Sequence, residues 1–535
     1  MSQGLTNIGG WSPTESHPAF NATELVSAIQ RVREPIHIVQ NGQGFLGLGL
    51  QGNLSTTVGD YSLLASLPAL YPEWLGDRAF LEAHGTRFPY VAGEMARGIA
   101  STQMVIAMGK ANMMAFYGTA GLSLDVIDAG ITEIESHLGT NCTFWGTNLI
   151  HDMNDPEIEG AVVNLFLKRN VTRVSASAFM SLTPHVVRYA CHGLHQSADG
   201  QIQRKNYLFA KISRPEVATH FMSPPPKNML DDLVNNGQLT RQEADLALQM
   251  PLSDDVTVES DSGGHTDNRP LLSLFPTIRE LRDKLTAQYN YSHNIRLGAA
   301  GGLGTPDAVA SAFALGASYV LVASVNQAAV ESGLSEDGRN MLMKIEMADV
   351  AMAPCADMFE LGVKVQVIKR GSMFANRASQ LYEVYNSCKG LDDIPPAKKA
   401  MLEKQLFKST LEATWENTRA FFMQHSPKEV ERAEKDPKHL MALVFRWYLG
   451  KSSHWPISGE SERRLDYQIW CGPAMGAFNT WVAGSFLEAP ENRTVVQIAK
   501  NLLEGAAIVT RAQQLRSYGL PVPASAFHFT PRVLN

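Results

Sequence analysis

The fold is decided by the stretch Ile295-Arg-Leu-Gly-Ala-Ala-Gly-Gly-Leu-Gly-Thr-Pro-Asp307. It opens with a short apolar run, Ile295–Ala299, and continues through closely spaced glycines. Thr305, Pro306 and Asp307 then have the order of an N-cap, a first-turn proline and a first-turn acid. The helix that they begin stops at Gly316, and a second apolar run follows at Tyr319–Ala323. This succession of strand, helix and strand indicates a parallel sheet.

The same alternation begins at Pro89 and extends over about 240 residues, a length typical of one barrel domain. Eight apolar, β-rich runs predict strands at Tyr90–Gly93, Met114–Gly118, Thr143–Leu149, Thr172–Ser177, Tyr207–Ser213, Asp255–Glu259, Ile295–Ala299 and Tyr319–Ala323. Eight strand–helix units match an α/β protein with a (β/α)₈ TIM barrel. A doubly wound open sheet is the alternative, because one misassigned run would break the count.

The chain of 535 residues exceeds the size at which a single core stops growing, so we expect at least two domains. We predict an N-terminal region over 1–88, the barrel over 89–335 and a mainly helical C-terminal domain over 336–535. A helical insertion at about 223–253 interrupts the barrel after its fifth strand. The glycine-studded stretch 41–49 fits neither phosphate-loop spacing, so packed β-structure or a bend is expected there.

Composition excludes several classes of function. The net charge of −7 and pI near 6.1, with dispersed basic residues, give no footprint for nucleic acid. No basic segment precedes an apolar run between Met1 and Glu15, and no apolar run reaches the roughly 18 residues of a spanning helix. We therefore expect a cytoplasmic protein that does not enter membranes. Five cysteines without C-x-x-C spacing indicate neither disulfides nor a metal site.

In a TIM barrel the carboxyl ends of the strands form the active site. The predicted strands end in glycines and polar residues, namely Gly93, Glu94, Met95, Asn148, Lys211, Asp261 to His265, Gly301, Gly302, and Ser324 to Asn326. Barrels commonly bind phosphate after strands seven and eight, through backbone N–H groups at helix N-termini. The loops Gly298–Gly304 and Ala323–Gln327 occupy those positions and predict a phosphate site.

The loop Ser260-Asp-Ser-Gly-Gly-His-Thr-Asp267 follows the sixth strand. Its two glycines would let the backbone approach a flat ligand, and His265 has the side chain whose ordinary pKa lies nearest neutrality. An ordinary turn with a solvated histidine is the alternative. Convergence of the other strand ends favours an active-site loop.

Several longer motifs resemble one family. They include Tyr90-Val-Ala-Gly-Glu-Met-Ala96, Phe209-Ala-Lys-Ile-Ser-Arg-Pro215, Ser262-Gly-Gly-His-Thr-Asp-Asn-Arg-Pro270, Ser324-Val-Asn-Gln327, Asp436-Pro-Lys-His439 and Asp466-Tyr-Gln-Ile-Trp-Cys-Gly-Pro-Ala-Met-Gly476. From Pro89 onward the chain resembles the PfaD family, the trans-acting enoyl reductases of polyunsaturated fatty acid and polyketide synthases. It is more distantly similar to nitronate monooxygenases and bacterial flavin-dependent enoyl reductases.

The resemblance implies FMN as the cofactor and NADPH or NADH as the hydride donor. It places His265 at the reactive face of the flavin as the catalytic residue. It further implies a cofactor-binding set of Gly93, Glu94, Met95, Asn148, Lys211, Asp261, Gly264, Gly301, Gly302, Ala323, Ser324 and Val325. In that set Lys211 would stabilise the anionic reduced flavin. Ala323 departs from the glycine that relatives usually have before Ser324.

The leading hypothesis is an enoyl reductase that acts on 2-enoyl thioesters held by acyl carrier protein. No carrier motif occurs in this chain, so the carrier is expected in trans, and a homodimer is expected by analogy alone. A nitronate monooxygenase is the nearest alternative. A Schiff-base lyase with Lys211 as nucleophile is an alternative of different chemistry, and a scaffold without activity is a fourth.

Overall fold

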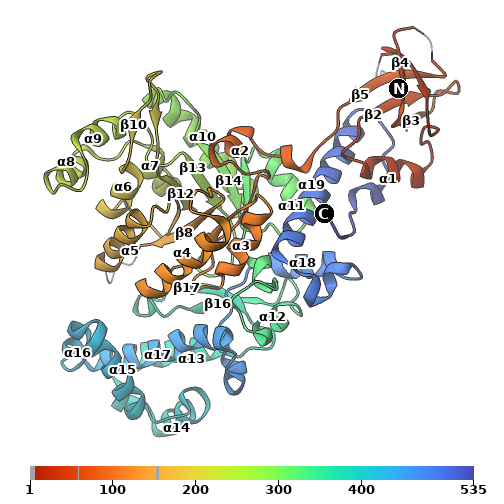
Figure 1. Cartoon of the computed structure of the whole chain (residues 1–535). Helices are drawn as coiled ribbons and strands as arrows, with labels where there is room; N and C mark the ends of the chain where they lie inside the picture. The colour runs from red at the N-terminus through yellow and green to blue at the C-terminus, as the bar shows by residue number, and fades with distance from the viewer. Residues whose placement is uncertain (1–5, 58, 152–155) are drawn as a thin grey trace.

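The computed structural model describes residues 6–57, 59–151 and 156–535. Its centre is a closed barrel of parallel strands in the order β12-β13-β14-β15-β6-β7-β8-β9 (Figure 1). The barrel strands are β6 (Tyr90–Ala92), β7 (Met114–Tyr117), β8 (Trp145–Ile150), β9 (Arg173–Ser177), β12 (Tyr207–Ile212), β13 (Asp255–Glu259), β14 (Arg296–Ala300) and β15 (Tyr319–Val322). The predicted TIM barrel is confirmed, and the open sheet is excluded because β15 pairs with β6.

Helices follow the strands around the barrel. They are α3 (Thr102–Lys110), α4 (Leu124–Leu138), α5 (Pro156–Lys168), α6 (Pro184–Cys191), α7 (Pro215–Met222), α10 (Leu271–Tyr289) and α11 (Pro306–Ala314). The expected insertion contains α8 (Lys227–Asn235) and α9 (Arg241–Ala247). Helix α11 begins as its sequence predicts, since the Thr305 side chain accepts a hydrogen bond from the Ala308 N–H. A small hairpin of β10 (His195–Gln196) and β11 (Ile202–Gln203) was not predicted.

The amino-terminal end of the barrel is closed by α2 (Arg78–His84). Phe80 of this helix stacks on Tyr319 with ring centroids 4.5 Å apart. His84 contacts Asp255, whose carboxylate also accepts two hydrogen bonds of 2.7 Å from Arg296. Burial would raise the pKa of Asp255, but Arg296 and His84 hold that pKa at about 2. This cluster, in which the Asp255 carboxylate is paired with Arg296 and His84, therefore holds α2 against the first residues of β13 and β14.

Arg296→Met should destabilise the protein by about 3–5 kcal/mol, because it leaves the buried Asp255 carboxylate without its cation. Thermal unfolding followed by circular dichroism measures the loss. Arg370→Met is the matched control, since Arg370 pairs with Glu346 and Asp349 in solvent and such pairs contribute about 0–1 kcal/mol. Equal unfolding midpoints for the two variants would contradict a stabilising role of the cluster.

The N-terminal region forms a five-stranded antiparallel sheet in the order β3-β2-β5-β1-β4. Its strands are β1 (Gly9–Pro13), β2 (Ile36–Gln40), β3 (Leu46–Gly49), β4 (Gly52–Ser55) and β5 (Tyr61–Leu67). Among them the sequence predicts β2 as a strand, through the β-type run Ile36-His-Ile-Val-Gln40. A Cβ on Gly49 would lie 2.6 Å from the Trp11 ring, so this glycine allows close packing inside the sheet. In the stretch 41–49, where packed β-structure or a bend is expected, residues 41–45 form the turn between β2 and β3, and the rest is β3.

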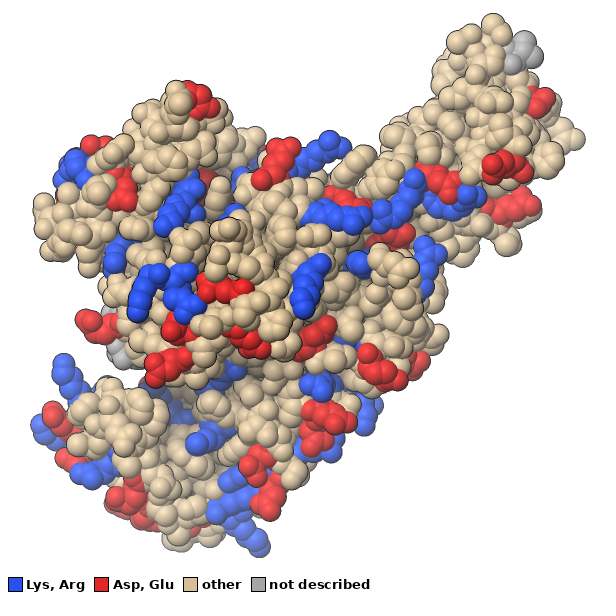
Figure 2. Space-filling model, viewed as in Figure 1, with Lys and Arg blue, Asp and Glu red and all other residues tan. Residues whose placement is uncertain are grey.

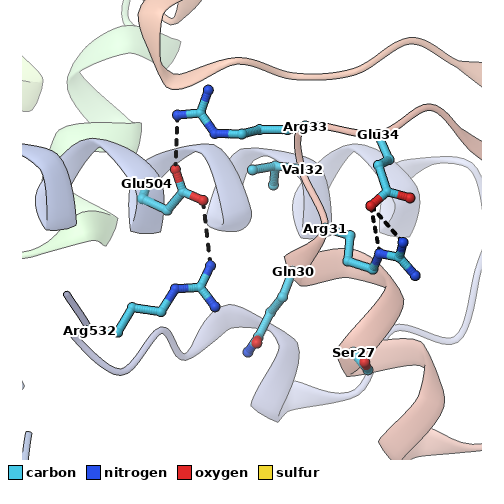
Figure 3. Close-up of a pocket in the computed structure, with 8 residues that line it drawn as sticks. All are labelled: Ser27, Gln30, Arg31, Val32, Arg33, Glu34, Glu504 and Arg532. Atoms are coloured by element: carbon cyan, nitrogen blue, oxygen red, sulfur yellow. Dashed lines mark hydrogen bonds and ion pairs between the residues drawn. The ribbon is translucent and has the colours of Figure 1, made fainter. Parts of the chain in front are cut away.

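The sheet lies at one end of the molecule and contacts the rest through α1 (Ala22–Gln30) and α19 (Val495–Ser517) (Figure 1). Figure 3 shows residues that line a pocket at this junction, with ion pairs between them. The volume of the pocket is about 290 Å³. Glu504 of α19 lies between Arg33 and Arg532, at 3.4 and 3.6 Å. Arg33 also pairs with Glu73 at 3.2 Å. These contacts connect the N-terminal sheet, α19 and the C-terminal segment.

After the barrel the chain is mainly helical. Its α-helices are α12 (Glu336–Leu342), α13 (Phe374–Ser387), α14 (Pro396–Leu402), α15 (Leu411–His425), α16 (Pro427–Ala433), α17 (Pro437–Ser458), α18 (Ala474–Val482) and α19. An antiparallel hairpin of β16 (Val350–Pro354) and β17 (Lys364–Ile368), which was not predicted, lies among them. One hydrophobic cluster continues from the barrel into this part, and no helix in the described ranges is long and apolar enough to cross a bilayer. The division at residue 335 stays a prediction.

Candidate active site

Each of the predicted site residues lies at or just beyond the carboxyl end of a barrel strand. Gly93, Glu94 and Met95 follow β6, Asn148 is in β8 and Lys211 is in β12. The remaining ones are Asp261, Gly264 and His265 after β13, Gly301 and Gly302 after β14, and Ala323, Ser324 and Val325 after β15. The barrel geometry brings these residues to one mouth, although it does not by itself give them roles.

The mouth contains a partly buried charge cluster of Lys211, Glu94 and Glu259. The Lys211 ammonium lies 3.1 Å from Glu94 and 3.3 Å from Glu259. The same oxygen of Glu94 accepts hydrogen bonds from the Ser175 and Ser177 hydroxyls. The second carboxylate oxygen of Glu94 is buried and has no partner among the described residues. It is therefore available to accept a hydrogen bond from a bound molecule.

Two carboxylates set the protonation of this cluster. Burial alone would lower the pKa of Lys211, but Glu259 and Glu94 raise it above its ordinary value. Burial would raise the pKa of Glu94, yet Lys211 and the hydrogen bonds to that carboxylate lower it. The pKa of Glu259 is raised by burial and by Glu94 despite Lys211. Glu259 is thus the first of the two carboxylates to take a proton.

This charge balance disfavours the Schiff-base lyase. A nucleophilic lysine must lose its proton, and such lysines have a lowered pKa. The pKa of Lys211 moves in the opposite direction. The Lys211 ammonium is also paired with two carboxylates, those of Glu94 and Glu259. Lys211 consequently holds the two acids together within the mouth.

The loop that carries His265 is held by the hairpin after the barrel. Gly264 and Gln366 of β17 exchange two backbone hydrogen bonds of 3.0 and 2.8 Å. The Gln366 side chain donates to Asp261 at 2.8 Å and to the Ser262 carbonyl at 2.7 Å. Trp470 lies against Gly264, where a Cβ would meet its ring at 3.7 Å. The Gly-Gly-His loop is therefore fixed by segments far along the chain.

His265 projects toward the loop that joins β16 and β17. Its Nε2 lies 3.1 Å from a carboxylate oxygen of Asp357. Partial loss of hydration lowers the pKa of His265, but the hydrogen bond and charge of Asp357 outweigh this effect and raise it. The pKa of Asp357 falls to about 2, because His265 more than offsets the effect of burial. Since 44% of the His265 side chain is exposed, the imidazole can exchange protons with solvent.

Asp357→Asn should lower the pKa of His265, because the substitution removes the negative charge that stabilises the imidazolium and leaves the desolvation. The fraction of protonated His265 at neutral pH then falls. Histidine selectively labelled with ¹³C reports the titration by NMR, and His265→Ala identifies the resonance. An unchanged or higher pKa in Asp357→Asn would disprove the coupling, while Asp349→Asn serves as the control on the same hairpin.

The loops after β14 and β15 carry free backbone donors. Gly301 and Gly302 have φ of +82° and +70°, values that favour glycine. The N–H groups of Gly301, Gly302, Ser324 and Val325 donate no hydrogen bond within the described part of the chain. A Cβ on Gly302 would meet nothing within 4 Å, whereas one on Gly301 would meet Ser260 at 2.6 Å. An open, donor-lined space thus adjoins Gly302.

The second of the two expected helix starts differs from an α-helix. Residues Ser324–Ala328 form the 3₁₀ helix η2, preceded by Ala323 with φ −120° and ψ −60°. Such a short turn still leaves its first N–H groups without intrahelical partners. The donors expected at this position are therefore present, but they lack the dipole of a long helix.

Reasoning from the sequence did not identify several residues of the mouth. Glu259 ends the sixth predicted strand, so the rule that selected Lys211 could have found it. Asp357, Gln366 and Trp470 come from the chain after the barrel, and no spacing along the sequence links them to His265. Only the hairpin geometry brings them there.

Similarity to known proteins identifies the kind of protein. Residues 388–467 match the family model of the inserted helical domain of [acyl-carrier-protein] S-malonyltransferase. The chain is 41% identical over 467 residues to a polyunsaturated fatty acid synthase component of Thraustochytrium sp. (strain ATCC 26185 / S-3), covering 85% of this chain and 31% of the relative. It is 40% identical over 514 residues to polyketide biosynthesis protein PksE of Bacillus subtilis (strain 168), covering 96% of this chain and 65% of the relative. The chain thus spans less than two thirds of either curated relative.

One solved structure is matched over nearly its whole length. The enoyl reductase domain of MlnA, from the macrolactin biosynthesis cluster of Bacillus amyloliquefaciens, superposes with a TM-score of 0.79 at 35% identity. The match covers 83% of this chain and 99% of that domain. The closed barrel and the polar carboxyl ends of its strands place the protein in the class of TIM-barrel proteins. The chain belongs to the enoyl reductase family of polyunsaturated fatty acid and polyketide synthases.

Proposed function

We propose that the protein reduces the carbon–carbon double bond of 2-enoyl thioesters carried by an acyl carrier protein, with FMN as cofactor and NADPH or NADH as reductant. The observation that carries this proposal is the half-exposed His265, paired with Asp357 at the barrel mouth beside the donor-lined loops of β14 and β15. Membership of the enoyl reductase family supports the same chemistry.

The residues at the mouth fit FMN. The unpartnered N–H groups of Gly301, Gly302, Ser324 and Val325 would hold its phosphate, and the open space at Gly302 would admit it. Gly93 and Met95 would contact the ring system through their backbone, and the free oxygen of Glu94 can accept from a ring N–H. Asn148, Lys211, Asp261, Gly264 and Ala323 stay predicted neighbours of the cofactor. When bound, FMN supplies the redox centre between the nicotinamide and the alkene.

Gly302→Leu should abolish FMN retention, because its side chain would fill the space beside the free donors. Gly519→Leu is the matched control, since Gly519 has φ +84° and likewise has no atom within 4 Å of a built Cβ. The two substitutions carry the same kind of backbone penalty. Absorbance at 450 nm relative to protein measures the flavin content. Full flavin occupancy in Gly302→Leu would show that the phosphate site is elsewhere.

The proton chemistry belongs to the chain. Reduction adds a hydride at the β-carbon and a proton at the α-carbon, and NAD(P)H becomes NAD(P)⁺. We assign the proton to His265, whose protonated form Asp357 stabilises by raising its pKa and which solvent can reprotonate. The cluster of Lys211, Glu94 and Glu259 contains two carboxylates and one ammonium group, and it is partly buried. Its role is to orient the cofactor through fixed charges rather than to supply an uncompensated cation.

His265→Ala should keep FMN and its reduction by NAD(P)H, while slowing reoxidation by an enoyl thioester roughly 10²- to 10⁴-fold, the usual contribution of a positioned acid. Stopped-flow absorbance follows the two half-reactions separately. Loss of the first half-reaction alone would assign His265 to nicotinamide binding. Loss of FMN would mean that the loop is structural.

The carrier protein is proposed as the partner in trans. Resemblance of residues 388–467 to a domain of an enzyme named for acyl carrier protein supports this partner. The homodimer stays a prediction, as does the choice between NADPH and NADH.

A further inference from the structure

Arg97 at the barrel mouth has an unusual backbone and an unpaired charge. Its φ of +59° is one that residues other than glycine seldom adopt, and such strain is concentrated at functional sites. Its guanidinium is partly buried, and it forms no ion pair with any residue in the described ranges. Its hydrogen bond goes to the Gly450 carbonyl of α17, at 3.3 Å. Because Arg97 has a strained backbone and no carboxylate partner in the described part of the chain, its guanidinium is available to bind an anion.

The charged and titratable groups near Arg97 include the carboxylate Asp357 and the α17 residues Lys451 and His454. Burial lowers the pKa of Arg97, and the charge of Asp357 offsets only part of that effect. On α17, partial desolvation together with Arg97 and Lys451 lowers the pKa of His454 to about 4, so His454 adds no charge of its own at neutral pH. Lys451 is exposed and forms no ion pair in the part of the chain that the structure describes. Asp357 is already paired with His265.

The space between α17 and the barrel can hold a ligand. A Cβ on Gly450 would meet nothing within 4 Å, so the helix surface is open beside the Arg97 guanidinium. Figure 2 shows a recess between the helical part and the barrel, with Lys and Arg side chains at its walls. Arg97 contacts Gly450, and its charge and that of Lys451 both act on His454; we call this group of residues the cationic recess. The charge of Asp357 acts on both Arg97 and His265, so the two cations lie within electrostatic range of the same carboxylate.

We propose that the cationic recess binds a phosphate ester of a reactant at the mouth, with Arg97 as the principal ligand and Lys451 as a second cation. This inference rests on the proposed function for the identity of the reactants. A guanidinium is suited to phosphate, because its planar N–H groups match two phosphate oxygens. Two reactants carry such a group, the phosphodiester arm of a carrier-bound thioester and the nicotinamide dinucleotide. The thioester arm fits better, since Gly450 and Lys451 belong to the segment 388–467, which resembles a domain of an enzyme named for acyl carrier protein.

The test measures binding without turnover. Butyryl phosphopantetheine and butyryl pantetheine are saturated thioesters that differ by one phosphate, and calorimetry gives their dissociation constants. The parent should bind the phosphorylated form on the order of tenfold more tightly, the usual value of a charged hydrogen bond. Arg97→Gly, which the positive φ accommodates without strain, should remove that difference. Lys451→Ala should reduce it.

Lys408→Gly is the matched control, because it also replaces a cation at positive φ, 53°, but in the helical part away from the mouth. It should leave the tenfold preference intact. If Arg97→Gly instead weakens NADPH binding and spares the thioester pair, the phosphate belongs to the dinucleotide and the thioester assignment is overturned. If Arg97→Gly changes neither the preference for the phosphorylated thioester nor the binding of NADPH, the phosphate site itself is overturned. If the parent prefers the phosphorylated thioester but reduces no enoyl thioester, the proposed function is refuted and the phosphate site stands.

Discussion

Ring closure of the parallel strands is the constraint on which the rest of the molecule depends. Pairing of β15 with β6 removes both sheet edges and forces eight carboxyl ends onto one circle. Residues more than two hundred positions apart, such as Gly93 and Val325, thereby reach the same mouth. The opposite end must then be filled from outside the ring. Helix α2 does so with Phe80, which explains why the chain before Tyr90 contributes to the barrel interior.

Two groups of paired charges lie inside the barrel, one at each end. At the closed end one acid is matched by one arginine and a histidine, and the resulting cluster is structural. At the mouth two acids share one lysine, and a carboxylate oxygen is left without a partner among the described residues. Burying a charge without partners is costly, so the incomplete pairing at the mouth marks the end at which a ligand completes the network. The two ends thus differ in charge balance, because the closed end pairs one carboxylate with an arginine whereas the mouth has two carboxylates for one lysine.

The sequence predicted the barrel closely because apolar runs and helix caps are local signals. β13 has its predicted limits, and the ends of the other seven strands shift by at most two residues. Local signals also placed Lys211 and His265 at strand ends. The ion pairs themselves, of Lys211 with Glu94 and Glu259 and of His265 with Asp357, could not be derived, since each joins segments that are distant in the sequence. The alternation in Lys364-Val-Gln-Val-Ile368 was a usable strand signal, whereas the two-residue strands β10 and β11 are too short to give one.

Strand β17 completes the loop of the barrel that carries His265, and this has a consequence for biosynthesis. Roughly a hundred residues separate Gly264 from Gln366, and a ribosome adds about 5–20 residues each second. The barrel strands are therefore made several seconds before the segment that fixes their histidine loop. A nascent chain halted after β15 contains every strand of the ring and yet lacks the backbone partner of Gly264. Completion of the mouth is accordingly a late event, so that a chain cut short leaves the histidine loop without its anchor.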